Sequence, residues 1–184
     1  ARGIDVTAEV TPHHLVLTED LVASYDPVYK VNPPLRSADD VQALRGALAD
    51  GTIDVVATDH APHPHEDKDC EWAAAAMGML GLETAFGVLM ETMVQPGLLS
   101  WRDVAECMSA RPARIGRVRT QGHELVPGAI ANITVVDPDG FLEVDPMRLA
   151  SKSRNTPYAG RRLPGRVVHT IHAGTPTVLD GALA

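Results

Sequence analysis

The feature that most constrains the fold is the run of residues 52–58 (TIDVVAT), in which β-branched and apolar side chains follow one another almost without interruption. Such a run is typical of a strand in a parallel sheet that is covered on both faces. The run ends abruptly in a polar stretch, residues 59–63 (DHAPH). The sequence therefore predicts an α/β fold in which Asp59 follows the carboxyl end of a buried parallel strand.

A second strand and a helix precede this run. Residues 4–10 are rich in β-formers and break at residues 11–14 (TPHH), so we expect a strand followed by a histidine-containing loop. Residues 37–51 carry apolar side chains at the spacing of one helix face, and they end in a glycine that suits the C′ position. Ser37 and Asp40 predict a capping box at the start of this helix.

Two more helices and a change of pattern follow. Residues 82–93 repeat apolar side chains at helical spacing and stop before a Pro-Gly pair, and Ser100 with Asp103 predicts another capping box ahead of a short helix. After residue 128 the sequence becomes β-rich. We expect strands at 131–136, 166–171 and 175–179, with turns at 138–140 and 173–174 and the last two strands paired as a hairpin. A domain boundary is expected near 120–128.

The composition excludes two classes of partner. The chain has 184 residues, with 16 Lys+Arg against 24 Asp+Glu, a net charge of −8, and 4% aromatic residues. Such a chain offers little to phosphate backbones, bases or anionic lipids, so no nucleic-acid or membrane partner is expected. The uncharged run 72–82 is too short for a membrane-spanning helix, which needs about 20 apolar residues. Two cysteines without a CxxC pair, and no visible secretory signal, favour a cytoplasmic protein.

Asp59 is the strongest candidate for chemistry. Two strands that each end in a histidine-containing loop, with a helix between them, fit a βα barrel, whose active sites lie at the carboxyl ends of the strands. A carboxylate at the end of a buried strand is desolvated unless a cation meets it, and a divalent metal is a common partner where histidines crowd the same loop. Such an aspartate can also accept a proton from metal-bound water. The alternatives for Asp59 are a helix cap or a buried ion pair.

The histidines have simpler explanations. His60, His63 and His65 can be loop side chains that hydrogen-bond the backbone. His13 and His14 favour a supporting structural role.

Two other segments could face a ligand. Asn32 stands before two prolines that fix the backbone and leave its amide displayed, although the local sequence by itself favours an Asx turn before proline. Met77 and Gly78 belong to a glycine-containing stretch that allows close approach of a ligand to the backbone. Because its order differs from that of a phosphate-binding loop, a nucleotide site is not expected.

Six short motifs run through the chain: residues 9–15 (EVTPHHL), 31–36 (VNPPLR), 58–63 (TDHAPH), 78–84 (GMLGLET), 112–115 (PARI) and 153–158 (SRNTPY). Together they resemble the bacterial-type dihydroorotases of the amidohydrolase superfamily and their close cyclic-amidohydrolase relatives. The resemblance covers nearly the whole chain.

The resemblance implies a (β/α)8 TIM-type barrel with a small β-sandwich domain, of which this chain would be the carboxyl-terminal portion. Residues 1–122 would supply strands seven and eight with their helices, and residues 123–184 would be a segment of the sandwich. It also implies a zinc site with one or two ions, and the interconversion of carbamoyl-aspartate and dihydroorotate in de novo pyrimidine biosynthesis. A homo-oligomer is expected, with aspartate carbamoyltransferase as a candidate partner.

Several residues match the family's functional positions. Asp59 resembles the metal-ligand aspartate after the eighth strand, which also serves as general base and acid. Asn32 and His63 resemble groups that hold the substrate, and the backbone at Met77 and Gly78 resembles the segment that faces the ring.

Other parts of the family's site have no match in the chain. The resemblance assigns no metal to His13, His14 or His60. The family's His-x-His pair, its substrate arginine, its bridging carboxylate or carboxylated lysine and two further metal histidines would lie upstream of Ala1. The chain alone is therefore expected to leave the barrel open and to be inactive.

Three alternatives remain open. The first is another cyclic amidohydrolase, a dihydropyrimidinase or an allantoinase, because the substrate arginine that separates these enzymes lies outside the chain. The second is a non-catalytic dihydroorotase-like subunit that scaffolds a partner enzyme, which the presence of Asp59, Asn32 and His63 argues against. The third is a self-contained metal-binding module that uses Asp59, His60, His63 and His65.

Overall fold

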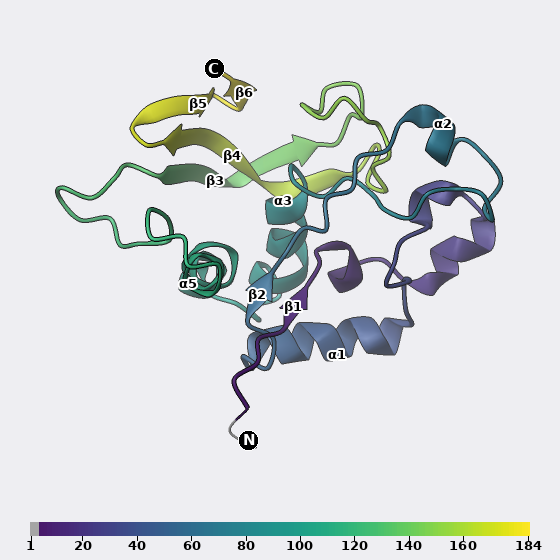
Figure 1. The fold of residues 1–184 in the computed structure, drawn as a ribbon, viewed down its shortest axis with the longest axis horizontal. Coiled ribbons are helices and arrows are strands. Elements are labelled where there is room, and N and C mark those ends of the chain that lie inside the picture. Colours follow the sequence, from purple (N-terminus) through teal and green to yellow (C-terminus); the bar gives the residue numbers. More distant parts are fainter. Residues whose placement is uncertain (1–3) are drawn as a thin grey trace.

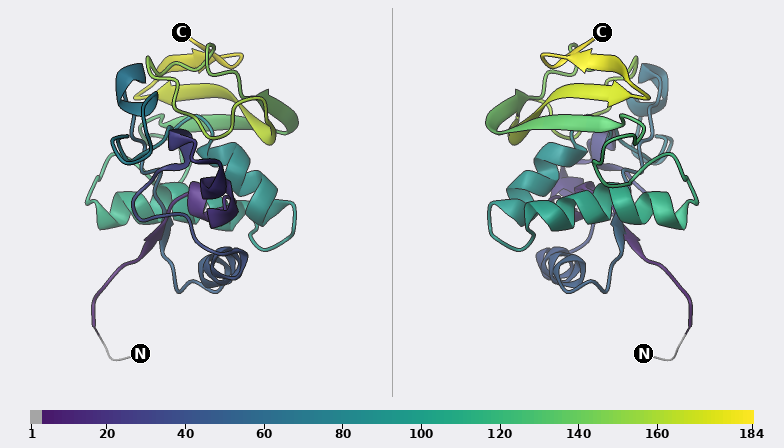
Figure 2. Two further views of the ribbon diagram at one scale, coloured as in Figure 1. Left: turned by 90° about the vertical axis from the view of Figure 1, so that its right-hand side faces the viewer. Right: turned by 90° about the vertical axis from the view of Figure 1, so that its left-hand side faces the viewer.

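The computed structural model describes residues 4–184. Figure 1 shows a lower part built from helices around two short central strands, and an upper part formed by an antiparallel sheet. Figure 2 shows the same layering from two sides, with the sheet above and helices beneath it. The fold is mixed α/β, and in residues 4–184 the parallel strands do not close into a barrel.

The two central strands are parallel, as the sequence predicted. β1 (Glu9–Val10) pairs with β2 (Val55–Val56), with Glu9 opposite Val55 and Val10 opposite Val56. Val55 and Val56 are both buried, so this strand is covered on both faces. The predicted lengths, 4–10 and 52–58, are wrong. Ile4 and Val6 are 70% and 74% exposed, because no second strand in the described part of the chain pairs beside them.

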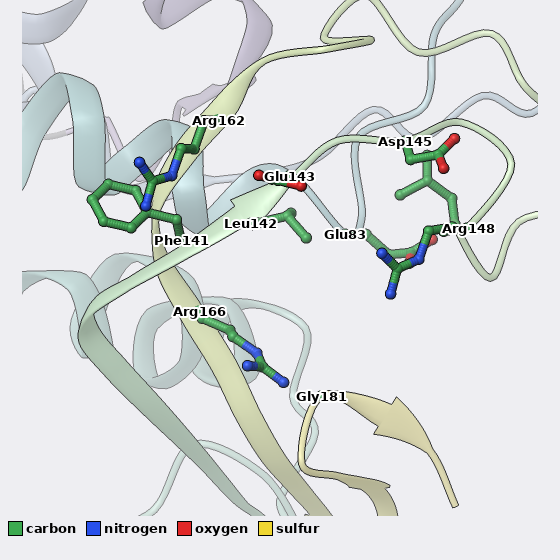
Figure 3. Close-up of a pocket in the computed structure, with 10 residues that line it drawn as sticks. Glu83, Phe141, Leu142, Glu143, Asp145, Arg148, Arg162, Arg166 and Gly181 are labelled. Carbon is green, nitrogen blue, oxygen red and sulfur yellow. The ribbon is translucent and has the colours of Figure 1, made fainter.

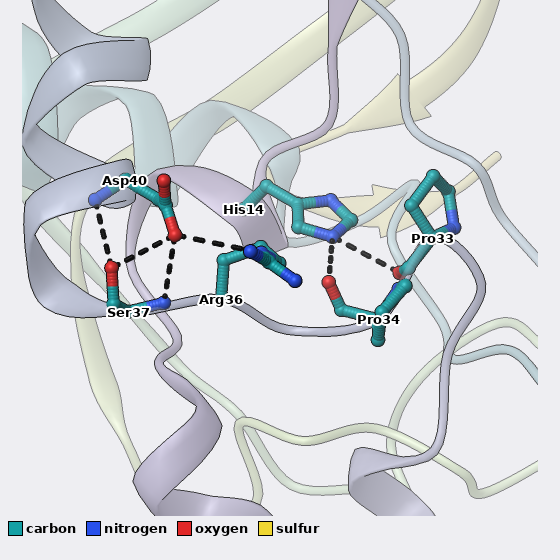
Figure 4. A network of polar contacts seen from close by, with 6 residues as sticks. All are labelled: His14, Pro33, Pro34, Arg36, Ser37 and Asp40. Carbon is teal, nitrogen blue, oxygen red and sulfur yellow. Dashed lines mark hydrogen bonds and ion pairs between the residues drawn. The ribbon is translucent and has the colours of Figure 1, made fainter.

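The predicted helix at 37–51 is confirmed as α1 (Ala38–Ala49). Ser37 accepts a hydrogen bond from the Asp40 amide, and the Asp40 side chain accepts from the Ser37 amide, which completes the capping box (Figure 4). These contacts lower the pKa of Asp40 below its ordinary value. Gly51 follows with φ +81°, the left-handed conformation that ends helices.

The other helices are short. Short turns of 3₁₀-helix follow β1 at η1 (His13–Leu15), η2 (Glu19–Ser24) and η3 (Pro27–Tyr29), and α2 (His65–Lys68) is a single turn. α3 (Ala85–Leu89) continues into a π-helical turn, η4 (Met90–Val94). The predicted capping box at Ser100 and Asp103 is confirmed at α4 (Trp101–Ala105), which runs on through η5 (Glu106–Ala110) and α5 (Arg111–Ile115).

The carboxyl-terminal part is a four-stranded antiparallel sheet in the order β3 (Ile133–Glu143), β4 (Arg162–His172), β5 (Thr175–Leu179) and β6 (Ala182–Leu183). The predicted hairpin is confirmed, because β5 pairs antiparallel with β4. The predicted turn at 138–140 is wrong. Those residues form a bulge within β3, between Asp137 opposite Arg166 and Phe141 opposite Pro164. β3 pairs with β4 again after the bulge. The turn-like residues therefore form an irregularity within one continuous strand and do not end it.

Two apolar clusters hold these parts together. The first gathers around β1 and β2, with Val10, Val56, Leu89 and Met93 among its members. The second joins the helical part to the sheet and contains Leu17, Val31, Leu35, Met79, Val88, Val144, Tyr158 and Leu163. The segments on either side of the expected 120–128 boundary therefore share a core, and the boundary itself stays a prediction.

At one point the helical part and the sheet pack glycine backbone directly against side chains of the other part. A Cβ on Gly87 of α3 would lie 2.8 Å from Leu163 Cβ, and a Cβ on Gly165 of β4 would lie 2.8 Å from the Phe86 ring. Gly165 also has φ +77°. Arg161 ties the same region with an ion pair to Glu91 at 2.8 Å. We call Gly87 and Gly165 the glycine seam.

No helix among residues 4–184 is both long and apolar enough to cross a membrane.

Candidate active site

Asp59 follows β2 and is exposed. Its φ of +46° places it in the left-handed region, which an aspartate tolerates better than most residues. Within residues 4–184 its carboxylate makes no hydrogen bond and no ion pair, so it forms neither a helix cap nor a buried salt bridge. The expectation that Asp59 is desolvated is wrong for this chain, because β2 has one paired neighbour and its carboxyl end lies open.

His60 has a structural task. Its Nδ1 accepts hydrogen bonds from the amides of Gly81 and Leu82, at 3.1 and 3.3 Å. Its backbone also forms a bridge with Met79. Because Nδ1 accepts two bonds, the ring carries its proton on Nε2. His60 therefore fastens the loop after β2 to the segment before α3, as the simpler explanation of this histidine predicted.

His63, Met77 and Gly78 lie together. Nε2 of His63 donates a hydrogen bond to the Met77 carbonyl at 3.0 Å, which leaves Nδ1 as the acceptor nitrogen of the neutral ring. Gly78 has φ +134°, and a Cβ there would come 2.5 Å from Ala61 Cβ and 3.0 Å from His63 Nε2. A side chain at position 78 would therefore push the two loops apart.

Asn155 joins these two loops, and the sequence did not point to it. Its Nδ2 donates to the Ala61 carbonyl at 2.9 Å and to the Gly78 carbonyl at 3.3 Å, while its Oδ1 accepts from the His63 amide at 3.3 Å. Its own carbonyl accepts from the Leu80 amide. Asn155 belongs to the 153–158 motif, so its place in that motif was the signal available.

Two lysines hold the segment that leads into Met77. Lys30 Nζ donates to the carbonyls of Trp72, Ala73 and Ala75 at 2.7, 3.2 and 2.7 Å. Lys68 Nζ donates to the carbonyls of Ala76 and Gly78, both at 2.9 Å, and more weakly to that of Lys30. Burial, followed by the nearby charge of Lys30, lowers the pKa of Lys68. No sequence pattern predicts that these lysines bind the carbonyls of an alanine-rich loop.

Asn32 reaches the same region through the backbone. The Gly78 amide donates to the Lys30 carbonyl at 2.9 Å. This bond places the segment that contains Asn32 beside Gly78. Asn32 is exposed, precedes a cis bond to Pro33, and its side-chain amide makes no hydrogen bond to any described residue. The Asx turn considered for it is therefore not formed.

The loop containing Asn32 is held by His14 of η1, which follows β1. His14 Nε2 donates to the carbonyls of Pro33 and Pro34, at 3.1 and 3.2 Å (Figure 4). Its Nδ1 accepts from the Thr11 hydroxyl at 2.7 Å. The predicted supporting role of His14 therefore has a definite geometry.

His13 is buried, with 2% of its surface exposed, and its Nε2 has no hydrogen-bond partner in the described part of the chain. Burial and the neighbouring His14 lower the pKa of His13 to about 3. His13 is therefore neutral at physiological pH.

Residues 4–184 contain no group of three or more His, Cys, Asp or Glu side chains that could hold a metal ion. The self-contained metal module is not supported, because His60 and His63 bind the backbone and His65 lies 3.1 Å from Asp69. Asp59 alone among the predicted ligands has a free carboxylate. It fits one ligand of a metal site whose other donors are not in these residues.

A cavity of about 500 Å³ adjoins the site. His63, Lys68, Arg154 and Asn155 are among the residues that line it. A separate cavity of about 450 Å³ lies against β3 and β4 and contains none of the predicted site residues (Figure 3). Glu83, one of its lining residues, accepts hydrogen bonds from the amides of Ala150 and Ser151, so its carboxylate is already occupied by the protein.

Comparisons with known proteins agree with this arrangement. The chain is 66% identical over 183 residues to a dihydroorotase of Streptomyces coelicolor, and 56% identical over 182 residues to one of Mycobacterium tuberculosis. These alignments cover 100% and 99% of the chain but 43% and 42% of the relatives, so the chain spans about two fifths of their length. The solved L-hydantoinase (dihydropyrimidinase) of Arthrobacter aurescens superposes with a TM-score of 0.90 at 33% identity, over 99% of this chain and 41% of that one. The model of the amidohydrolase family matches residues 9–177, and the chain belongs to that family.

Proposed function

We propose that this chain is the carboxyl-terminal part of a dihydroorotase, a zinc-dependent cyclic amidohydrolase that interconverts carbamoyl-aspartate and dihydroorotate. The observation that carries the proposal is the 66% identity, along the whole chain, to a protein named dihydroorotase. The clustering of His63, Met77 and Gly78 beside the exposed Asn32 supports it, because these are the substrate-holding positions that the resemblance assigns.

In this proposal Asp59 moves the proton. Its carboxylate is exposed and bound to no described residue, so an oxygen is free to accept a proton and to pass it to the ring nitrogen that leaves during hydrolysis. The same carboxylate would be one zinc ligand, with one or two ions held mainly by donors outside this stretch. When bound, the metal supplies polarisation of the amide carbonyl and a water of lowered pKa.

His63 and Asn32 orient the substrate. With Nε2 of His63 committed to the Met77 carbonyl, its Nδ1 is the nitrogen left to accept a hydrogen bond from a ring N–H. The exposed amide of Asn32 can donate and accept at once. The backbone at Met77 and Gly78 is held by Lys68, Lys30 and Asn155, so it would meet the ring as a fixed edge.

The architecture follows the same proposal. β1 and β2 would be the seventh and eighth strands of a (β/α)8 barrel, with the domains divided at residues 122 and 123, and β3–β6 would belong to a small β-sandwich. A homo-oligomer, an association with aspartate carbamoyltransferase and a cytoplasmic location remain predictions of the family resemblance and of the sequence.

A dihydropyrimidinase is the second candidate. The superposition on the L-hydantoinase favours it, although the 33% identity there is half the 66% identity to the Streptomyces coelicolor relative. An allantoinase and a non-catalytic scaffold subunit are weaker candidates, because no observation favours them.

A substrate panel with the full-length protein tests the proposal. Dihydroorotate, dihydrouracil, hydantoin and allantoin would be compared as substrates of the zinc-loaded enzyme. We expect kcat/KM for dihydroorotate to exceed the others by at least about 10²-fold, since a site that binds a ring carboxylate loses much when it is missing. Turnover of dihydrouracil or hydantoin without dihydroorotate would favour a dihydropyrimidinase, and no turnover of any substrate would favour the scaffold. Residues 1–184 alone are expected to be inactive.

A further inference from the structure

We propose that Asn155 is a positioning residue that locks residues 61–63 to the Met77–Gly78 turn and so sets the substrate-binding edge of the site. The inference rests on the proposed function and deepens it, because nothing so far gives the 153–158 motif a task. Asn155 does not reach the exposed Asp59 carboxylate and is not a catalytic residue.

The amide of Asn155 is fully used. Its two N–H groups meet the carbonyls of Ala61 and Gly78, and its oxygen meets the His63 amide. The residue is 7% exposed, so these hydrogen bonds take the place of bonds to water. The reverse orientation of the amide would aim its oxygen at two carbonyls, so the hydrogen-bond network fixes the orientation.

These bonds connect segments that are remote in the chain. Asn155 lies 94 residues from Ala61 and 77 from Gly78. Gly78, which cannot accept a Cβ beside Ala61 and His63, needs both loops held at contact distance. Lys68 Nζ donates to the same Gly78 carbonyl at 2.9 Å, but its other hydrogen bonds go to the carbonyls of Ala76 and Lys30 and not to the 61–63 loop. Two direct bonds also join these loops, from His63 Nε2 to the Met77 carbonyl and from the Ala61 amide to the Met79 carbonyl. Asn155 adds a third connection that holds Ala61, His63 and Gly78 through one side chain.

Few side chains could do this. Asparagine offers two donors and an acceptor in one short planar group, whereas aspartate has no donor when ionised and serine has one. If the bridge is lost, His63 and the Met77–Gly78 backbone shift relative to each other, and substrate binding weakens, while the proton-carrying Asp59 stays on its own strand end. We therefore expect the effect to fall on KM more than on kcat.

The test uses the full-length enzyme with Asn155→Ala, and with Asn155→Asp, which keeps the volume and the acceptor for the His63 amide. Asn132→Ala is the matched control, because Asn132 also joins two segments, through Thr120 and Ala173, but lies beside the sheet. We expect KM for dihydroorotate to rise about tenfold or more in both Asn155 variants, with kcat within about threefold of wild type. Asn132→Ala should leave both constants unchanged.

Hydrogen–deuterium exchange supplies a readout that is independent of activity. In the Asn155 variants, exchange should accelerate in residues 61–63 and 76–78 together. In Asn132→Ala, exchange should stay at the wild-type rate in both segments. A lowered Tm with an unchanged KM, or faster exchange in one of the two loops alone, would overturn the positioning role. If wild-type enzyme does not act on dihydroorotate, the proposed function fails, and the exchange comparison still decides whether Asn155 couples the loops.

Discussion

The two loops that follow β1 and β2 look alike in sequence and differ in the folded chain. Each begins at the carboxyl end of a parallel strand and contains histidines. After β1, His13 and His14 are 2% and 8% exposed, and His14 is spent on holding Pro33 and Pro34. After β2, Asp59 is exposed and bound to nothing described. A histidine or carboxylate at a strand end is thus no indication of function until its hydrogen-bond partners are known.

The difference has a physical origin. In the β1 loop, His14 satisfies both ring nitrogens within the protein, through the Thr11 hydroxyl and the carbonyls of Pro33 and Pro34. Nε2 of the buried His13 has no partner in the described part of the chain. The β2 loop keeps its carboxylate in solvent and fixes only the surrounding histidines, with His60 and His63 tied to backbone groups. The first loop is support and the second is the candidate site. Four sets of substitutions test that division.

Asp59→Asn should have the largest effect. It keeps the size of the side chain and removes its charge and its ability to accept a proton, so kcat of the full-length enzyme should fall at least about 10²-fold. The measurement is steady-state kinetics with metal content determined in parallel. Asp39→Asn, an exposed carboxamide change on α1, is the control and should retain wild-type kcat. A fully metal-loaded Asp59→Asn enzyme with near wild-type kcat would remove Asp59 from proton transfer.

His63→Ala and Asn32→Ala should come next, with KM for dihydroorotate raised about tenfold or more and kcat lowered less. Their proposed task is to hold the substrate, and His63 also supports the Met77 carbonyl. His60→Ala is the comparison, because it should loosen the loop and lower Tm more than it changes KM. Equal KM values for wild type, His63→Ala and Asn32→Ala would show that the substrate does not bind against His63 and Asn32.

His13 should make stability depend on pH. Its pKa is about 3 in the fold against an ordinary 6.5, so the unfolded chain binds a proton that the folded chain refuses. The contribution of His13 to the free energy of unfolding is fully present above pH 6.5. It falls as the pH drops toward 3, by up to about 1.4 kcal/mol per pH unit. Urea unfolding at pH 7, 6, 5 and 4 measures this slope. His13→Leu should flatten it, and the exposed His123→Gln should not. An unchanged slope in His13→Leu would mean that another group titrates.

Ser37→Ala should have the smallest effect, about 1 kcal/mol of unfolding free energy, because α1 loses the hydroxyl of its capping box. Ser37→Thr retains the hydroxyl and is the control. Kinetic constants should be unchanged in both, since α1 begins after the loop that His14 already fixes. An altered KM in Ser37→Ala would show that the support extends from the β1 loop into the helix.

Local rules predicted the elements whose causes are local. α1, both capping boxes and the β4–β5 hairpin depend on residues a few positions apart, and all are confirmed. The strand predicted at 175–179 is confirmed as β5, whereas the lengths of the other four predicted strands were wrong, because they depend on which partners lie alongside. The bulge at 138–140 reads as a turn for the same reason, since only the pairing with β4 shows that the strand continues.

The site shows the same limit. His63, Met77 and Gly78 could be nominated from motifs, and they lie together in the fold. Asn155 and Lys68 could not be given their tasks, because their partners are carbonyl groups that every residue possesses. The exposure of Asp59 was missed, since burial at a strand end is decided by neighbouring strands.

The glycine seam has a consequence for evolution and for protein engineering. Backbone meets side chain directly at Gly87 and Gly165, so neither position has space for a larger residue. A substitution in the helical part cannot be compensated by a small shift in the sheet. A chimera that takes β3–β6 from a relative and residues 86–90 from this chain must therefore keep glycine at both positions. Recombination between relatives should succeed at crossover points in the exposed stretch 116–130, and only when both sides of the seam keep glycine.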